Sequence, residues 1–392
     1  MTEQRQIPFS PPDITQAEID EVVDTLRSGW ITTGPKTKRL ENELASFIGA
    51  GKVACLNSAT AALECGLRLL GVGPGDEVIT SAYTYTASAS AICHVGATPV
   101  LCDVAPGSFE MDYDALSRLV TDNTRAVIPV DIAGRMVDYD RVREAVGDVP
   151  VLADGAHSLG ARRHGQNSGQ AADLTAFSFH AVKNFTTAEG GALTWRRGFL
   201  DDEEAYRRVM LMALHGQNKD ALAKTRAGAW EYDIAFPGWK CNMTDIQAAL
   251  GLVQLERYPH LLARRREIVE RYEAGLADAG VTLLKHFEGD ADAGGFASSA
   301  HLMLVRLNDR DRAFRDALIE RLALAGVATN VHYKPLPMLT AYRDLGFDIA
   351  DFPNACAQFE NEITLPLHTL LTDGDVDYVI EQFRRCKTEL ER

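Results

Sequence analysis

The chain has 392 residues, of which 46% are hydrophobic and 24% charged, and its formal net charge is −15 at pH 7. This length predicts two or more lobes, and the acidic balance excludes non-specific nucleic-acid binding, which needs a basic surface. Because no apolar run could cross a bilayer and the N-terminus has no signal-peptide pattern, we expect a cytoplasmic protein without a membrane partner. The seven cysteines include no CxxC pair, which predicts free thiols, most of them buried, and no metal site.

Short apolar runs alternate with amphipathic runs over roughly residues 50–250. The apolar runs are typical of strands, and the runs between them are typical of helices. Such alternation predicts a mostly parallel sheet with helices on both faces. We expect strands at 52–57, 76–82, 98–104, 125–132, 149–156 and 174–179, and helices at 60–71, 86–96, 115–120 and 139–147.

A long amphipathic run begins near residue 245, and Pro259 is expected to kink or split it. We expect an α/β chain with a large domain at residues 1–250 and a smaller C-terminal α+β domain at residues 251–392, joined by this long helix. Beyond the helix, the sequence predicts a strand, a helix and an extended segment, at 301–307, 310–326 and 327–333.

Polar residues follow the first two predicted strands, at the sheet edge where α/β proteins bind ligands. Ser58, Ala59 and Thr60 open a helix, whose free N–H groups favour a phosphate, and the Thr60 hydroxyl adds a donor. The alternative is that Ser58 or Thr60 only caps the helix. Tyr83 and Tyr85 stand at the next junction, where a ring either stacks on a planar ligand or packs in the core.

Ionisable residues follow the later strands. Asp154 ends an apolar strand, with His157 three residues later. A carboxylate there is costly unless paired; it either holds a protonated ring nitrogen or caps a turn. Lys183 follows the strand at 174–179. A lysine against apolar walls loses its proton readily and its neutral amine forms Schiff bases, whereas an ordinary lysine is solvated.

Together these groups describe a phosphate site, a stacking ring, an acid for a ring nitrogen and a Schiff-base lysine. That set matches the needs of pyridoxal 5′-phosphate (PLP), because a carboxylate beside the pyridine nitrogen keeps the ring an electron sink. The same lysine can also act as the base that moves a proton. The order of these groups along the chain suits an aspartate-aminotransferase-like fold, PLP fold type I.

The chain resembles the DegT/StrS family of PLP-dependent sugar aminotransferases over nearly its whole length. The stretches that carry the resemblance are SGWITTGPKTKRLE (28–41), NSATAAL (57–63), ADGAHSLGA (153–161), SFHAVKNFTTAEGG (178–191), GWKCNMTDIQAALGLVQLERY (238–258) and NVHYKPLP (330–337).

The resemblance implies a role for each matching residue. Where relatives often carry SGTAAL, Ala59 fills the glycine position, and where many carry G-x-N-x-R, either Asn242 or Lys240 reaches the phosphate. That group is donated by the neighbouring subunit, so the resemblance implies a homodimer with the active site at its interface. The remaining roles are Lys183 as the Schiff-base lysine, Asp154 on the pyridine nitrogen, His157 near the ring hydroxyl, Tyr85 stacked on the ring, and Thr60, the Ala61 amide and Ser178 on the phosphate.

The resemblance also suggests the substrates. Through its SFHxxK and TTxEGG patterns the chain resembles the branch that aminates C-4 of a nucleotide-linked 4-keto sugar. Through its GWITTGPK and G-x-K-x-N patterns it is most similar to the UDP-4-amino-4-deoxy-L-arabinose-forming type. Members that act at C-3 more often carry Tyr where this chain has His180. His180 contacts substrate or only packs, and Lys240 and His332 are further substrate candidates.

Glutamate is the implied amino donor, in a ping-pong cycle. The alternatives are a C-3 sugar aminotransferase, a PLP lyase acting on an ordinary amino acid, and a PLP-binding regulatory protein without turnover. The last is disfavoured by the intact set of Lys183, Asp154 and the phosphate residues.

Overall fold

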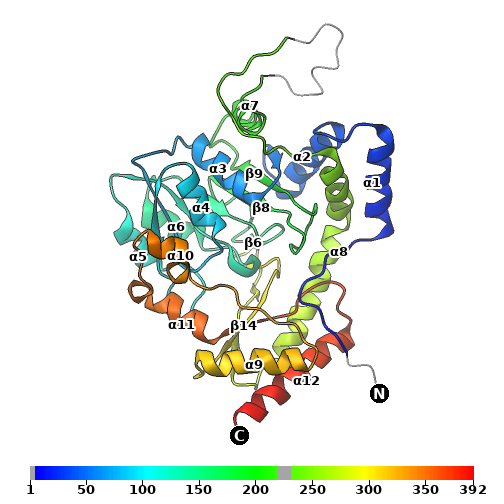
Figure 1. The fold of residues 1–392 in the computed structure, drawn as a ribbon, viewed down its shortest axis with the longest axis vertical. Coiled ribbons are helices and arrows are strands. Elements are labelled where there is room, and N and C mark those ends of the chain that lie inside the picture. Colours follow the sequence, from blue (N-terminus) through cyan, green and yellow to red (C-terminus); the bar gives the residue numbers. More distant parts are fainter. Residues whose placement is uncertain (1–4, 219–230) are drawn as a thin grey trace.

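The computed structural model describes residues 5–218 and 231–392 (Figure 1). Its centre is a sheet of two strand groups, joined by the parallel bridges Val127–Val151 and Val130–Asp154. Every neighbouring pair is parallel except the pairs of β9, which is antiparallel to both neighbours, so the expected mostly parallel sheet is confirmed. In spatial order the strands are β3 (Thr98–Cys102), β2 (Glu77–Ser81), β4 (Thr124–Ile128), β5 (Leu152–Asp154), β8 (Leu174–Ser178), β9 (Gly191–Trp195) and β1 (Val53–Leu56).

Helices cover both faces of this sheet, because alternate strand residues enter different clusters of buried side chains. In β8, Ala176 packs with α3, α4 and α7, whereas Phe177 packs on the other face with α2 and α8. Helices α5 and α6 pack on the face of the sheet that carries the side chains of Ile79 in β2 and Val127 in β4. The bounds are α2 (Pro35–Ile48), α3 (Ala59–Leu69), α4 (Ala87–His94), α5 (Tyr113–Leu119), α6 (Tyr139–Val146), α7 (Asp202–Ala213) and α8 (Asp245–Leu276).

The long helix α8 runs through Pro259 without being split, so the expectation of a split there is wrong. Leu255, Tyr258 and Leu261 around the proline are buried in the cluster with α2, and this packing offsets the lost backbone hydrogen bond. The first half of α8 lies beside α1 (Gln16–Ser28) and α2, and its end lies near α12 (Asp373–Leu390), as Figure 1 shows.

A second, antiparallel sheet has the order β10 (Val281–Leu283), β13 (Met303–Leu307) and β14 (Glu362–Leu365). The end of α8, α9 (Arg312–Leu324) and α12 share its buried cluster, which also takes in Ile7. Residues 327–333 form only isolated bridges, Ile7–Val327 and Asn330–Thr364. The boundary at residue 250 stays a prediction. The smaller elements are β6 (Arg162–Arg163), β7 (Gln166–Asn167), β11 (Phe287–Glu288), β12 (Phe296–Ala297), α10 (Thr340–Asp344), α11 (Pro353–Asn361) and the 3-10 turns Ile132–Gly134, Leu336–Met338 and Ile349–Asp351.

The sequence predicted no membrane-spanning segment, and it predicted free, mostly buried cysteine thiols. In the described ranges, no helix combines the length and the apolar character that crossing a bilayer requires. All seven cysteines are free thiols, and Cys55, Cys65, Cys102 and Cys386 are buried. Cys93 is exposed, so burial holds for only part of the set.

Candidate active site

A cavity of about 500 Å³ opens at the carboxyl edge of the central sheet. Parallel strands end at one edge, so side chains that follow β1, β2, β5 and β8 meet there. The cavity brings together most of the residues predicted from the sequence: Ala59, Thr60, Tyr85, Asp154, His157, Ser178, His180, Lys183 and His332.

The first turn of α3 lies unusually close to β9. A Cβ atom built on Gly191 would lie 2.4 Å from the Ser58 carbonyl carbon and 2.5 Å from the Ala59 nitrogen. Only glycine permits this approach of two backbones. Because β9 is antiparallel, its first residue lies at the same edge as the last residues of β1 and β8. Gly191 therefore lets the N-terminus of α3 reach the cavity.

Lys183 lines the cavity and is partly buried. Burial lowers the pKa of its amine to about 8, and the nearby charge of Asp154 acts in the opposite direction. Its backbone N–H donates to the His180 carbonyl at 2.9 Å, which fixes the loop. A lysine with this pKa holds a substantial neutral, nucleophilic fraction near neutral pH. The alternative of a fully solvated lysine is therefore wrong.

The Asp154 carboxylate is buried and held by two donors. Ser88 Oγ donates to Oδ2 at 2.7 Å, and the Ala156 N–H donates to Oδ1 at 3.1 Å. Burial raises the pKa of Asp154, while these hydrogen bonds and Lys183 lower it. Within the described residues Asp154 has no ion-pair partner within 4 Å. A cationic ring nitrogen in the cavity would offset the cost of burying this charge.

His157 is held as one tautomer by two neighbours. The Ala133 N–H donates to Nδ1 at 3.2 Å, and the Tyr333 hydroxyl lies 3.1 Å from Nε2. Burial lowers the pKa of His157 well below its ordinary value, and the positive charge of Lys183 acts in the same direction. The ring is therefore neutral with its proton on Nε2, which donates to the Tyr333 oxygen.

The first turn of α3 agrees only in part with the predicted phosphate site. Ser58 Oγ accepts a hydrogen bond from the Ala61 N–H at 3.1 Å, so Ser58 caps the helix. Ala61 lines a different cavity, beside Lys240. Its amide already donates to Ser58, and its phosphate role stays a prediction. Thr60 faces the site cavity, and its hydroxyl has no hydrogen-bond partner in the described part of the chain.

His332 and Tyr333 reach the cavity from the C-terminal third of the chain. The His332 N–H donates to Glu362 at 2.8 Å, its Nδ1 lies 2.9 Å from Thr364 Oγ1, and its carbonyl accepts from the Tyr83 hydroxyl at 2.8 Å. Burial lowers the pKa of His332 to about 3. Tyr83 thus packs and positions His332 instead of stacking on a ligand. Sequence reasoning missed Tyr333, whose only signal was its place beside His332.

Two side chains predicted to contact ligands remain accessible. The Tyr85 side chain is 62% exposed, and its ring centroid lies 6.0 Å from that of Tyr333. The His180 side chain is 46% exposed, with Nε2 3.7 Å from a Glu189 carboxylate oxygen. The alternative that His180 only packs is therefore wrong, and both rings are available to a ligand.

Asn242 and Lys240 do not line this cavity. Asn242 is buried, bridges to Leu56, donates to Thr33 Oγ1 and accepts from the Lys240 ammonium. Lys240 lines the neighbouring cavity that contains Thr60 and Ala61. Within one chain neither residue completes the site, and their role toward a neighbouring subunit stays a prediction.

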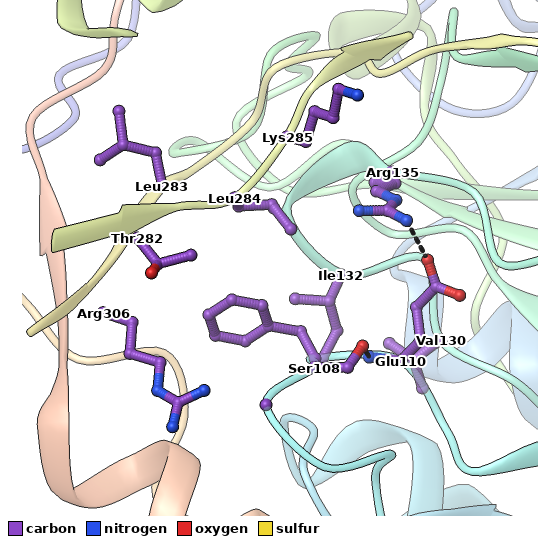
Figure 2. Close-up of a pocket in the computed structure, with 12 residues that line it drawn as sticks. Ser108, Glu110, Val130, Ile132, Arg135, Thr282, Leu283, Leu284, Lys285 and Arg306 are labelled. Atoms are coloured by element: carbon purple, nitrogen blue, oxygen red, sulfur yellow. Dashed lines mark hydrogen bonds and ion pairs between the residues drawn. The ribbon is translucent and has the colours of Figure 1, made fainter. Parts of the chain in front are cut away.

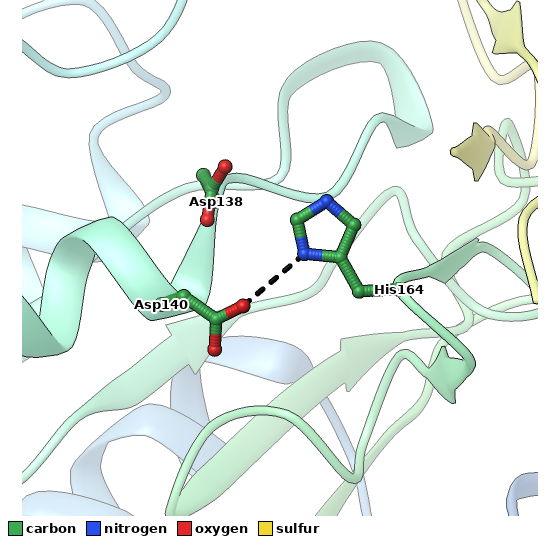
Figure 3. A group of neighbouring side chains, drawn as sticks. All are labelled: Asp138, Asp140 and His164. Carbon is green, nitrogen blue, oxygen red and sulfur yellow. Dashed lines mark hydrogen bonds and ion pairs between the residues drawn. The ribbon is translucent and has the colours of Figure 1, made fainter. Parts of the chain in front are cut away.

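A second group of polar side chains gathers at the start of α6 (Figure 3), where Asp138, Asp140 and His164 offer atoms within 4.8 Å of one another. Asp138 is already engaged, because it binds Arg163 at 2.8 Å and caps α6. His164 Nδ1 lies 3.2 Å from Asp140. These contacts account for the group as local structure.

The donors of the cavity fit PLP. Lys183 supplies an amine of lowered pKa, and Asp154 is a buried carboxylate without an ion-pair partner in the described ranges. Thr60 offers an unengaged hydroxyl at a helix N-terminus, which suits a phosphate. Tyr85 presents an accessible ring beside them.

Comparison with known proteins gives concordant matches. A family model described as the DegT/DnrJ/EryC1/StrS aminotransferase family matches residues 12–384. The spore coat polysaccharide biosynthesis protein SpsC of Bacillus subtilis is 38% identical over 386 residues, which is 96% of each chain. These matches span nearly the whole chain.

Solved structures extend the likeness to the fold. The candidate sugar aminotransferase Spr1654 of Streptococcus pneumoniae, in its PMP form, superposes with a TM-score of 0.94 at 55% identity, over 98% of this chain and 100% of that chain. Helicobacter pylori PseC, an aminotransferase involved in the biosynthesis of pseudoaminic acid, gives 0.88 at 27% identity, over 98% and 100%. The Streptococcus protein is also known in a PLP form. The expected fold type I is therefore confirmed.

Proposed function

This chain belongs to the DegT/DnrJ/EryC1/StrS aminotransferase family and is a PLP-dependent sugar aminotransferase; on that premise, we propose that it transfers an amino group from glutamate to C-4 of a nucleotide-linked keto-sugar. The observation that carries the proposal is the pairing of Lys183, with its lowered pKa, and the buried Asp154 in one cavity. We assign Lys183 as the catalytic residue.

When bound, PLP supplies an electron sink for the carbon that loses or gains a proton. Asp154 would pair with the cationic ring nitrogen, and its two hydrogen-bond donors keep the carboxylate oriented. Thr60, Ser178 and the Ala59 backbone would hold the phosphate at the start of α3, and the Tyr85 ring would stack on the cofactor. Neutral His157, held by Tyr333, would serve the ring hydroxyl.

The Lys183 amine carries the proton in both half-reactions. With PLP bound, the neutral amine would move a proton from the donor carbon to the cofactor in the first half-reaction, and from the cofactor to the acceptor carbon in the second. Because one amine serves donor and acceptor, the two substrates use the cavity in turn, as ping-pong kinetics requires. His180 is exposed at the cavity and His332 lines it, so we assign both to substrate binding.

The choice of a C-4 keto-sugar rests on His180, since relatives that act at C-3 more often carry Tyr at this position. The cavity volume of about 500 Å³ leaves room for a substrate beside the cofactor. A C-3 acceptor is the alternative, and it predicts turnover with 3-keto but not 4-keto nucleotide sugars.

The test follows the absorbance of the purified PLP-loaded enzyme during addition of glutamate without sugar. We expect the PLP band to give way to that of pyridoxamine phosphate, with 2-oxoglutarate released in equal amount. Nucleotide-linked 4-keto sugars should then restore the PLP band, whereas 3-keto sugars should not. Lys183→Ala is the control and should lose conversion by several orders of magnitude. A PLP band that ignores glutamate would refute the assigned donor.

We also propose that the enzyme is a cytoplasmic homodimer. Large apolar side chains lie exposed on α1, just after it, and on the segment that leads into α8: Ile19, Leu26, Ile31, Tyr232, Ile234, Phe236 and Trp239. Large exposed apolar side chains favour a protein interface. Such an interface would bring Asn242 or Lys240 near the site of a second copy.

A further inference from the structure

A second cavity, of about 200 Å³, lies between the central sheet and the C-terminal sheet (Figure 2). Its walls are the turn at residues 107–110 after β3, the segment at residues 130–135 after β4, and the facing side of β10 and β13. It shares only Val130 with the lining of the PLP cavity. The two cavities are therefore separate sites.

Arg306 of β13 is the unpaired charge of this cavity. Within the described residues its side chain forms no hydrogen bond or ion pair, and its Nε is buried without a hydrogen-bond acceptor. In Figure 2 the guanidinium turns from β13 toward the cavity. Its Nη1 lies above Gly107, 2.8 Å from the position that a Cβ atom would take there. A buried donor without an acceptor is costly, and an anion would remove that cost.

The other charges of the lining leave the cavity positive. Arg135 and Glu110 neutralise each other at 2.8 Å, and Glu110 also accepts from the Tyr113 hydroxyl. Lys285 pairs with Glu288 at 3.0 Å, but both side chains are more than half exposed, so that pair is weak. Among the described residues no carboxylate therefore compensates the charge of Arg306, although the chain has 55 acidic and only 40 basic residues.

Apolar side chains complete the walls: Phe109, Ile132 and Leu284. We propose that this cavity is a binding site for a small phosphate or carboxylate attached to a compact apolar group. The guanidinium of Arg306 binds the oxyanion through paired N–H donors, and Phe109 and Leu284 cover the apolar part. Because the walls come from both sheets, the bound anion contacts the two parts of the molecule at once.

The test is calorimetric titration of the PLP-loaded enzyme with phenyl phosphate, benzoate and inorganic phosphate. The cofactor then fills its own phosphate site. We expect saturable binding of one phenyl phosphate per chain, tighter than that of inorganic phosphate, because the ring adds apolar contact. A ranking of phenyl phosphate against benzoate distinguishes a phosphate ester from a carboxylate as the natural ligand. Arg306→Gln should weaken the binding of phenyl phosphate and of benzoate by about tenfold or more.

Arg343→Gln is the matched control, since Arg343 is an exposed arginine on α10 outside the cavity, and it should bind as the wild type does. If Arg306→Gln does not fold, Phe109→Leu gives a second measure and should weaken phenyl phosphate but not inorganic phosphate. Equal affinity in wild type and Arg306→Gln, or no saturable binding in the wild type, would overturn the proposal. None of these readouts uses turnover, so the result is independent of the proposed reaction.

Discussion

Lys183 is the residue whose environment decides whether the site can work near neutral pH. Burial lowers its pKa to about 8, whereas the ordinary value of a lysine is 10.5, so the neutral amine appears at lower pH in the folded protein than in the unfolded chain. In protein freed of PLP, reductive methylation of Lys183 by formaldehyde and cyanoborohydride should accelerate as pH rises, with a midpoint near 8. Peptide mass spectrometry gives the rate at each pH.

Asp154→Asn tests the cause of that pKa. The Asp154 charge raises the pKa of Lys183, so its removal should move the midpoint to lower pH. The exposed Lys334 in the same digest corrects for reagent concentration. A midpoint that stays near 10 in the wild-type protein would show that burial does not control this amine.

The sequence predicted the site residues that directly follow strands, since position at a strand end is a local property. Lys183, Asp154 and Thr60 belong to this group. Tyr333 does not, because its contact with His157 joins positions 176 residues apart and depends on how the C-terminal segment packs. The Ala61 amide carries a further contact that the phosphate prediction did not include, because the Ser58 hydroxyl competes for the same N–H group.

At the scale of elements, the contact between β9 and α3 positions the phosphate end of the site. Gly191→Ala should push the two apart, since its Cβ atom would overlap the Ser58 and Ala59 backbone. We expect a loss of about 1–3 kcal/mol in the free energy of unfolding and weaker retention of PLP. Urea unfolding and equilibrium dialysis measure the two effects.

The matched control for that change is Gly73→Ala, because a Cβ atom on Gly73 meets no atom within 4 Å. It should leave stability within about 0.5 kcal/mol and PLP retention unchanged. If Gly191→Ala behaves like Gly73→Ala, the close approach of β9 and α3 does not set cofactor affinity.

The sequence predicted those helices and strands whose apolar residues follow a clear pattern along the chain. Alternating apolar runs located β1 to β5 and β8, and their order along the chain indicated a parallel sheet. Strand β9 was not predicted, because its short apolar run follows two glycines and its direction depends on pairing with β1 and β8, which are distant along the chain. The expected split of the helix at Pro259 was wrong for a similar reason. The burial of Tyr258 and its neighbours outweighs the local cost of a proline.

At the scale of the whole molecule, a single chain leaves the proposed phosphate contact of Asn242 unmet, because Asn242 lies outside the PLP cavity. A second copy would supply it, and mixing two inactive variants tests this. Lys183→Ala lacks the catalytic amine, and Asn242→Ala lacks the donated amide. A hybrid dimer would contain one site with both groups intact. Random reassociation of equal amounts should therefore restore about one quarter of wild-type activity.

The activity regained on mixing distinguishes a site shared between two chains from a site built within one chain. In both cases each variant alone is inactive. If Asn242 serves its own chain, each site of the hybrid lacks one group, and mixing restores nothing. If Asn242→Ala alone keeps full activity, Lys240→Ala takes its place in the same experiment, because Lys240 contacts Asn242 and lies beside Thr60. Different affinity tags on the two variants, with purification on both tags in turn, show whether hybrids form. Hybrid dimers without recovered activity from either pair would contradict a site shared between subunits.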